Sequence, residues 1–430
     1  MSAELFELNL DFASPAPPPA PAPRKGFVED ILAFREFSTE TRQVVTRATT
    51  FDGQPIEVPT YVNEFWTAQQ RQASSLHEVS YRACFKPQLP RFFIERLTQP
   101  GDVVYDPFMG RGTTPVEAAL LGRVPYGNDI NPLSVTFTRP RLCPPTLDAV
   151  AARLKEIPFH EPAEAPEDLL VFYHPDTLRQ IAALRKYLYV RRQTGRLEPI
   201  DEWIACVALN RLTGHSNGFF SVYTLPPNQA VSVVSQRKIN EKRSQTPDRR
   251  DVAALILKKS RQLLGDVDAA TWRTLARAAK DARLLTGPAD ATPDIPSGSV
   301  ALVVTSPPFL NVVQYATDNW LRCWFLGLDA QSIAISVPSK LNKWQEVMSG
   351  VFRELARVLK PGGHVAFEVG EVHGGTTKLE EAVLPCGVAA GLTPRCVVIN
   401  DQEFTKTANC WGVDNMSKGT NTNRIVVMRK

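Results

Sequence analysis

The stretch that decides the fold is Val103-Val-Tyr-Asp-Pro-Phe-Met-Gly-Arg-Gly-Thr-Thr114. Its first residues predict a short buried strand, and a helix is expected soon after Gly112. Thr114 is the predicted cap of that helix, with Pro115 in the first helical position and Glu117 completing a capping box. A strand that leads through a glycine-rich turn into a helix is typical of the ligand-binding edge of a doubly wound sheet.

The alternation of strands and helices continues on both sides of this turn. A parallel-sheet strand is predicted at Val300–Val304, where the apolar run is unbroken. The other expected elements are a helix at Phe92–Leu97, a strand ending at Asp129, a helix at 343–359 stopped by Lys360-Pro-Gly-Gly363, a strand at His364–Val369, and an antiparallel pair at Arg395–Ile399 and Arg424–Met428.

These elements predict an α/β fold with a doubly wound, mostly parallel sheet and a largely helical inserted domain. Residues 1–27 are expected to be a disordered or polyproline arm, because prolines crowd residues 14–23. The predicted parts that follow are an N-terminal segment with the cofactor-binding half at 28–139, an insertion for target recognition at 140–270, and a catalytic half at 271–430.

Composition limits the function classes. The net charge is +4, which is compatible with a polyanionic partner. The cysteines are scattered and odd in number, without a Cys-x-x-Cys pair, so we expect no zinc module and no disulfide framework, and a cytoplasmic setting. No apolar stretch is long enough to span a membrane, and the N-terminus lacks the features of a secretory signal.

The glycine turn has the chemistry of a nucleoside cofactor site. Gly110 and Gly112 let the backbone approach a ligand, and the helix start offers free amides. Asp129 ends the next strand, where a carboxylate accepts hydrogen bonds from ribose hydroxyls. Asp281 is the expected end of a third strand and a partner for the adenine amine. Taken alone, the turn is also compatible with a tight bend that binds nothing.

A second motif, Thr305-Ser-Pro-Pro-Phe309, follows the strand at Val300–Val304 directly. The exocyclic amine of cytosine or adenine is a poor nucleophile, because its lone pair is delocalised into the ring. Ser306 Oγ and the Pro307 carbonyl can accept its two N–H bonds, and Pro308 stiffens the loop. Phe309 offers a face on which an extruded base can stack.

The two motifs together resemble the S-adenosylmethionine-dependent DNA amino-methyltransferases. Asp106–Thr114 looks like their cofactor motif, and the segment at Lys86-Pro87 resembles the one that packs over the methionine end of the cofactor. Ser306 resembles the residue of N4-cytosine enzymes, whereas adenine enzymes more often carry Asp or Asn there. The resemblance and the turn together predict these cofactor-binding residues: Lys86, Pro87, Asp106, Phe108, Gly110, Gly112, Thr113, Thr114, Asp129, Ile130, Asp281 and Ala282.

The inserted region carries amides, aromatics and cations close together, which suits contacts with double-stranded DNA. The predicted DNA-binding residues are Asn217, Asn228, Gln229, Arg237, Lys238, Lys242 and Arg243. After the catalytic motif, Asn311 and Tyr315 are further site candidates. The polar stretch 404–424 resembles a tail segment of the same family, and either a DNA-contacting loop or an ordinary hairpin fits it.

Four alternatives stay open at this point. Methylation at C5 of cytosine would need a cysteine nucleophile, and Cys386 lies far beyond the motif in an apolar setting. An RNA amine methyltransferase, a DNA-binding protein without activity and an NAD-dependent oxidoreductase are the others. Pro115 disfavours the last, because it stands where the third glycine of dinucleotide binding would fall. A cognate restriction enzyme is a conceivable partner that the sequence does not test.

Overall fold

The computed structural model describes most of the chain. The described residues are 26–37, 39–67, 73–81, 84–224, 230–308, 315–333, 338, 340–372, 377–401 and 422–430. The predicted arm therefore falls almost entirely outside them. Its last residue, Phe27, instead begins helix α1, where its ring packs 6.1 Å from that of Phe93.

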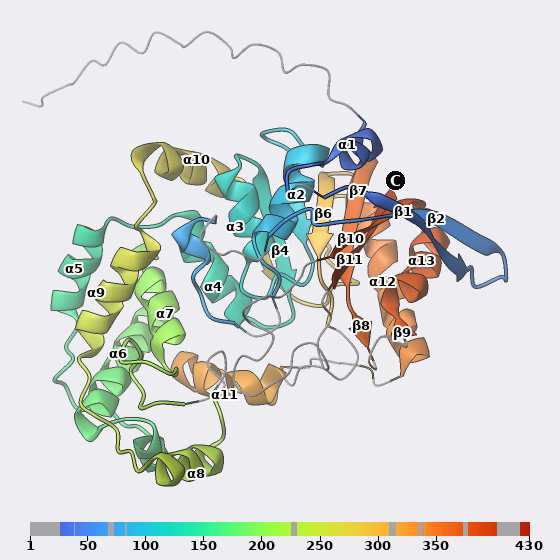
Figure 1. The fold of residues 1–430 in the computed structure, drawn as a ribbon. Helices are drawn as coiled ribbons and strands as arrows, with labels where there is room; N and C mark the ends of the chain where they lie inside the picture. The colour runs from blue at the N-terminus through green and yellow to red at the C-terminus, as the bar shows by residue number, and fades with distance from the viewer. Residues whose placement is uncertain are drawn as a thin grey trace, which may run out of the picture.

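Within the described residues, nine strands form one sheet in the order β1-β2-β10-β11-β7-β6-β3-β4-β5 (Figure 1). The strands of this sheet are β1 (Arg42–Thr49), β2 (Pro55–Asn63), β3 (Val103–Asp106), β4 (Val124–Asp129), β5 (Arg283–Thr286), β6 (Val300–Thr305), β7 (Leu359–Val369), β10 (Thr393–Asp401) and β11 (Thr422–Arg429). A separate pair is formed by β8 (Glu371–Val372) and β9 (Thr377–Lys378).

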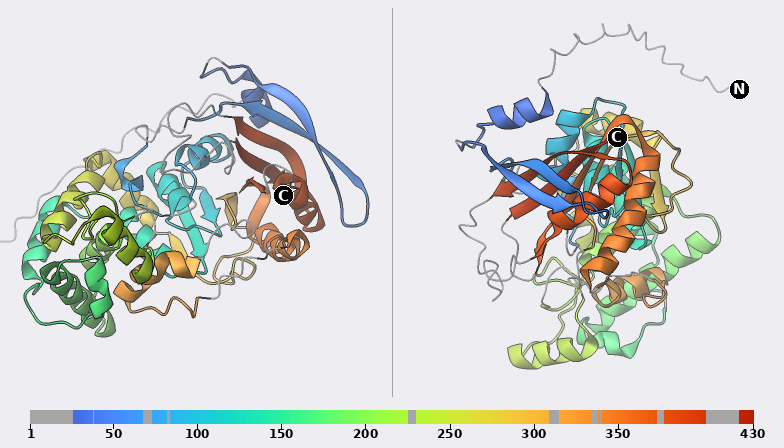
Figure 2. Two further views of the ribbon diagram at one scale, coloured as in Figure 1. Left: turned by 60° about the horizontal axis from the view of Figure 1, so that its bottom comes forward. Right: turned by 90° about the vertical axis from the view of Figure 1, so that its right-hand side faces the viewer.

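Strands β5, β4, β3, β6 and β7 are parallel to one another, and β11 is antiparallel to both β7 and β10. The predicted fold class and the antiparallel C-terminal pair are thereby confirmed. Strands β1 and β2 were not expected. They form an antiparallel hairpin that joins the sheet through β10 and extends beyond its edge (Figure 2).

The helices, in chain order, are α1 (Phe27–Ala33), α2 (Gln88–Leu97), α3 (Thr113–Leu120), α4 (Leu133–Leu142), α5 (Leu147–Glu156), α6 (Pro175–Gln193), α7 (Pro199–Arg211), α8 (Val233–Arg243), α9 (Val252–Leu263), α10 (Ala269–Ala279), α11 (Tyr315–Leu326), α12 (Leu341–Val358) and α13 (Leu379–Ala389). None of the described helices is long and apolar enough to cross a membrane.

Alternate residues of the central strands enter two different cores. Val104 and Leu302 pack with the aromatic side chains of α2, whereas Tyr105 and Val303 pack with α12 and α13. This alternation follows from the pleat of a strand, which points successive side chains to opposite faces. Because both faces are covered by helices, the central strands are apolar throughout, as predicted for β6.

A third core holds the inserted helices together. It joins buried residues of α4 to α7 and α9 to α11, among them Trp203 and Ile256. The insertion leaves the sheet after α4 and returns through α10, which contacts α3 and β4 before the chain enters β5. Helix α11, which follows β6 in sequence, also packs on the inserted helix α6.

Two local predictions were wrong. Helix α3 begins at Thr113, its N-cap is Gly112 in the left-handed region, and no side chain caps it, so the predicted capping box does not form. Glu117 is instead drawn away by buried partners described below. The Lys360–Gly363 segment ends α12 as expected, but it lies within β7, which starts at Leu359 rather than at His364.

Candidate active site at the carboxyl edge of the sheet

The two sequence motifs leave the sheet from neighbouring strands. Strand β3 pairs directly with β6, with Tyr105 opposite Val303. At the end of the strands, Thr305 Oγ1 donates a hydrogen bond of 2.6 Å to Asp106 Oδ1. Because both strands run in the same direction, the glycine turn and the proline loop begin side by side at one edge.

Asp106 organises this junction. Its Oδ1 also accepts a 3.0 Å hydrogen bond from the Phe108 amide, which holds the turn against the strand end. The carboxyl is buried, and burial raises the pKa of Asp106 to about 7, although these hydrogen bonds act in the opposite direction. Thr114 Oγ1 donates to the Val304 carbonyl at 3.1 Å, so α3 is also tied to β6.

The backbone conformation of the turn favours glycine at two positions. Gly112 has φ +79° and Gly110 has φ +50°, values that L-residues rarely adopt. At Gly112 a Cβ would also collide with the side chain of Thr138 on α4, whereas at Gly110 it would lie at an ordinary contact distance of 3.6 Å from the ring of Tyr81. Gly112 is therefore required by both conformation and space, and Gly110 by conformation.

Asp129 lies at the end of β4, as predicted. Its Oδ2 accepts a 2.8 Å hydrogen bond from the Gly110 amide, and its Oδ1 accepts one of 2.8 Å from the Asn131 amide. Burial raises the pKa of this carboxyl. Each carboxylate oxygen has a second lone pair, so Asp129 can still accept hydrogen bonds from a ligand.

Buried arginines hold the N-terminal segment against the turn. Arg111 Nη1 donates to the Val79 carbonyl at 2.7 Å, and Arg141 donates to the carbonyls of Leu76 and Arg111. The Arg111 side chain is thereby buried against the N-terminal segment. Lys86 and Pro87 lie at the start of α2, where Pro87 is the N-cap residue.

Glu117 belongs to the same anchor. Its Oε2 lies 2.7 Å from His77 Nε2, and its Oε1 accepts from Arg91 Nε at 2.6 Å. His77 and Glu117 are both about 1 % exposed, so this carboxylate cannot reach the helix start that it was expected to cap. Burial lowers the pKa of His77.

The proline loop carries a serine beside a buried carboxylate. The Ser306 hydroxyl lies close enough to Glu368, near the end of β7, to favour its charged form, and Asn423 Nδ2 donates to Glu368 Oε1 at 2.8 Å. Burial raises the pKa of Glu368. Trp344 Nε1 of α12 donates to the Pro308 carbonyl at 3.0 Å, which fixes the second proline. Pro307 is buried beside them.

Glu368 and Asn423 were missed as site residues. The signal for Glu368 was available, since a carboxylate stood near the end of an otherwise apolar predicted strand. Asn423 lies at the end of the polar stretch 404–424, of which 404–421 are outside the described residues. Phe309 and Asn311 also lie outside them, and Tyr315 is described only as the first residue of α11.

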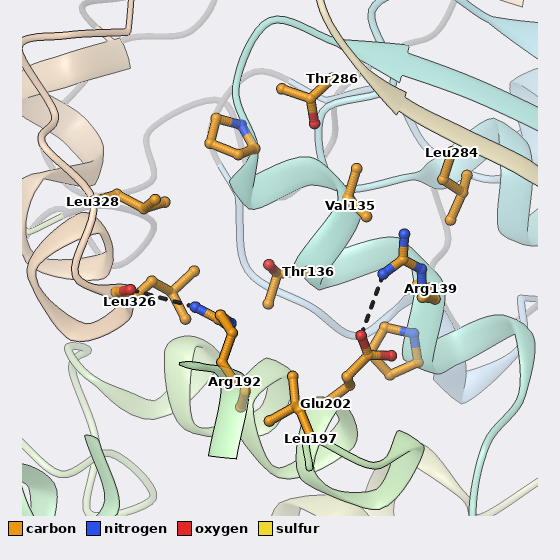
Figure 3. A pocket seen from close by; sticks show the side chains of 13 residues that line it. Val135, Thr136, Arg139, Arg192, Leu197, Glu202, Leu284, Thr286, Leu326 and Leu328 are labelled. Carbon is orange, nitrogen blue, oxygen red and sulfur yellow. Dashed lines mark hydrogen bonds and ion pairs between the residues drawn. The ribbon is translucent and has the colours of Figure 1, made fainter. Parts of the chain in front are cut away.

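Asp281 and Ala282 are not at the predicted place. They precede β5, whereas a ligand at this edge would meet the residues that follow it. The strand ends at Thr286, which lines a cavity of about 300 Å³ between the sheet domain and the inserted helices (Figure 3). Arg139 of α4 and Glu202 of α7 form an ion pair of 3.3 Å in its wall.

The predicted DNA-binding cations lie on an exposed helix. Arg237, Lys238, Lys242 and Arg243 all belong to α8 and are exposed, and none forms an ion pair with a described residue. Arg243 lies 3.8 Å from the centre of the Tyr223 ring.

The amides of the predicted set are placed differently. Asn217 accepts a hydrogen bond from Arg250 Nη2 at 2.9 Å. Asn228 and Gln229 lie outside the described residues.

Comparison with known proteins connects this edge to one family. Residues 34–137 match the model of a DNA methylase family, N6_N4_Mtase. The type II methyltransferase M.BsoBI of Geobacillus stearothermophilus is 24% identical over 347 residues, which cover 69% of this chain and 64% of that protein. The type II methyltransferase M.MvaI of Kocuria varians is 32% identical over 97 residues, covering 22% of this chain and 20% of its own.

These matches leave part of each relative uncovered, since the chain spans less than two thirds of their length. A candidate DNA modification methylase from Thermus thermophilus, solved with S-adenosyl-L-methionine, is 22% identical over 34% of this chain and 53% of that chain. Its TM-score is 0.20, so the overlap in shape is slight.

S-adenosylmethionine is the cofactor of this family, and the edge fits it. Along the turn, Phe108, Gly110, Asp129 and Ile130 are half-exposed, whereas Asp106, Gly112, Thr113 and Thr114 are buried beneath them. Asp129 would hold the ribose hydroxyls, and the glycines let the backbone lie close to the ligand. When bound, the cofactor supplies an electrophilic methyl group. Residues 34–137 thus match the N6/N4 DNA methylase family in the part of the chain that holds the glycine turn and Asp129.

Proposed function

We propose that the protein transfers a methyl group from S-adenosylmethionine to the exocyclic amine of a base in double-stranded DNA, and that the amine is N4 of cytosine. The observation that carries the proposal is the Thr305–Asp106 hydrogen bond of 2.6 Å. It joins the end of the cofactor strand to the start of the proline loop. A cofactor on the glycine turn and a base at Ser306 would therefore be neighbours.

The position of Ser306 suits its hydroxyl to accept a hydrogen bond from an amine N–H. A hydroxyl has one hydrogen and two lone pairs. We infer that the hydrogen is directed to Glu368, because the hydroxyl influences that buried carboxylate and a carboxylate can only accept. The lone pairs remain for an N–H of the base. This arrangement draws the amine nitrogen away from conjugation with the ring, and its own lone pair becomes available for the methyl group.

The same contacts give the departing proton a path. When the nitrogen forms its bond to the methyl carbon, it carries one proton too many. Ser306 Oγ can take that proton while its own hydrogen moves to Glu368. This transfer neutralises both the positive charge on the nitrogen and the negative charge on the carboxylate. Burial raises the pKa of Glu368, which favours its acceptance of a proton.

The choice of cytosine rests on Ser306. A neutral hydroxyl whose hydrogen is directed to Glu368 offers lone pairs only, which matches an amine with two N–H bonds. Adenine presents the same exocyclic group, so N6 of adenine is the second candidate. The Asp or Asn common in adenine enzymes is absent from this position, which favours cytosine.

We also propose that the inserted helices bind the target DNA. The exposed cations of α8 suit contacts with phosphates. Hydrogen bonds connect the entry to α8 with α11, which follows the proline loop: Trp320 Nε1 donates to the Val231 carbonyl at 3.3 Å. A helix placed in this way can hold the duplex beside the loop that receives the base.

Expression in a host that lacks both N4-methylcytosine and N6-methyladenine tests the proposal. Genomic DNA would be digested to nucleosides and analysed by mass spectrometry. N4-methylcytosine is the expected product. N6-methyladenine instead would overturn the choice of cytosine as the target base and leave the proposed reaction in place. If the purified chain binds S-adenosylmethionine and DNA but modifies neither base, and Ser306→Ala behaves identically, the proposed activity is wrong and a binding role replaces it.

A further inference from the structure

One arginine of α11 contacts the segment that lies beside the cofactor turn. Arg322 is 8 % exposed. Its Nη2 donates to the Ser80 carbonyl at 3.0 Å, and its Nη1 donates to Asn319 Oδ1 at 2.8 Å. Helix α11 is a separate element from both the glycine turn and the 73–81 segment, so this hydrogen bond joins parts that are distant in sequence.

The guanidinium lies over two aromatic rings. Its carbon is 5.6 Å from the centre of the Tyr81 ring and 5.5 Å from that of Phe137. The two rings pack edge to face, with their centres 5.8 Å apart. A planar guanidinium can cover aromatic faces and still donate from its rim, which an ammonium group cannot do in the same way.

The Tyr81 ring in turn packs on the glycine turn. A Cβ added to Gly110 would lie 3.6 Å from Tyr81 Cε1, so the ring lies beside this glycine, where an added methyl group would touch it. The Gly110 amide donates to Asp129, the proposed ribose ligand. Arg322 is therefore connected through Tyr81 and Gly110 to the carboxylate at the end of β4.

We propose that Arg322 is a positioning residue for the cofactor: it holds Ser80 and Tyr81 over the glycine turn, and so sets the affinity for S-adenosylmethionine. The proposal rests on the proposed function. Its physical basis is that a turn with two glycines at positive φ has little stiffness of its own. The turn needs an outside contact to keep Gly110 and Asp129 in one arrangement.

The position of α11 gives this contact a further consequence. Arg185 of the inserted helix α6 donates to the Trp324 carbonyl at 2.8 Å, and α11 starts soon after the proline loop. The helix that carries Arg322 is thus held by the inserted domain. Arg185 contacts Trp324 and not Ser80 or Tyr81, so its loss should leave the contacts of Arg322 with that segment in place.

The test compares Arg322→Met with Arg185→Met, using the full chain without DNA and calorimetric titration of S-adenosylhomocysteine. Arg185 is the matched control, because it also donates to a backbone carbonyl and lies 5.3 Å over a ring of α11, yet it contacts neither Ser80 nor Tyr81. Arg322→Met should weaken binding on the order of tenfold, through loss of a charged hydrogen bond and a cation–π contact. Arg185→Met should bind as the wild type does.

Further variants keep the proposal falsifiable. Arg322→Lys keeps one cation and should recover part of the affinity. If Arg322→Met does not fold, Tyr81→Leu removes the ring alone and should weaken binding in the same direction. In steady-state assays the KM for S-adenosylmethionine should rise while kcat stays near the wild-type value. Wild-type affinity in both Arg322→Met and Tyr81→Leu overturns the inference. Absence of binding by the wild type overturns the proposed function instead.

Discussion

The carboxyl edge of the sheet and helix α8 differ in how their polar groups are partnered. At the edge, Asp106 and Glu368 are buried and Asp129 is half-exposed, and each accepts hydrogen bonds from defined donors. On α8, the four cations are exposed and form no ion pair with a described residue. Chemistry on a base amine needs fixed acceptors. Contact with a phosphate backbone needs charge that is still available. The two regions suit these two tasks.

The largest expected effect is at the serine. Ser306→Ala removes the acceptor proposed for the amine, and kcat should fall roughly a thousandfold, as for loss of a preorganised group in a transition state. Affinity for S-adenosylhomocysteine should not change. Ser299→Ala, just before the opposite end of β6, is the control. Similar losses in both variants would show that the effect is on the strand, not on the chemistry.

Replacing Glu368 by Gln tests whether its charge matters. The amide of Asn423 can turn to offer its oxygen, so a hydrogen-bonded arrangement survives while the proton acceptor is lost. We expect kcat to fall about a hundredfold, within the range for acid–base groups. Single-turnover methylation of a host-DNA fragment measures it, with the exposed Glu381→Gln as control. An unchanged rate would remove Glu368 from the proton path.

Asp129→Ala should act on cofactor binding rather than on turnover. Two hydrogen bonds from backbone amides lose their acceptor, as do the proposed bonds to the ribose. The Kd for S-adenosylhomocysteine should rise by about tenfold to a hundredfold. Asp129→Asn keeps one acceptor, so its Kd should lie between those of Asp129→Ala and the wild type. Equal affinity in all three would refute the assigned role.

The α8 cations should give a smaller effect that depends on salt. For Arg237→Ala with Lys238→Ala, DNA binding should weaken roughly fivefold, and the slope of log Kd against log salt should decrease by about two. The control pair, Arg273→Ala with Arg277→Ala, removes the same charge from α10, which lies far from α8 (Figure 1). Equal slopes for the two pairs would mean that only net charge counts.

The smallest expected effect concerns stability against pH. The pKa of Asp106 is raised from 3.8 to about 7, so the folded state binds a proton more tightly than the unfolded one. The contribution of Asp106 to the free energy of unfolding is present at low pH and is lost as pH rises through about 4 to 7. Asp106→Asn keeps an acceptor for Thr305 without the charge. Its free energy of unfolding, from urea titrations, should decline less steeply over this range than that of the wild type. Parallel curves would contradict the assignment.

Much of the site was predictable because it is local in sequence. The strand–turn–helix at 103–114 and the strand before Ser306 were confirmed, and Asp129 ends β4 as expected. These patterns are short and are determined by neighbouring residues. The capping box failed because Glu117 pairs with His77 and Arg91, which come from other elements. The prediction that Asp281 ends the third strand was wrong, because β5 begins two residues after it, at Arg283.

The amino-acid sequence by itself determined the order of the elements, the two motifs and the positions where glycine is required. Only the tertiary structure decided which strands are neighbours, that Glu368 lies near Ser306 and accepts from Asn423, and that Arg322 donates to Ser80. The physical reason is that strand pairing and buried charge depend on contacts between residues far apart in the chain. Local patterns of hydrophobicity and turn residues carry no record of such contacts.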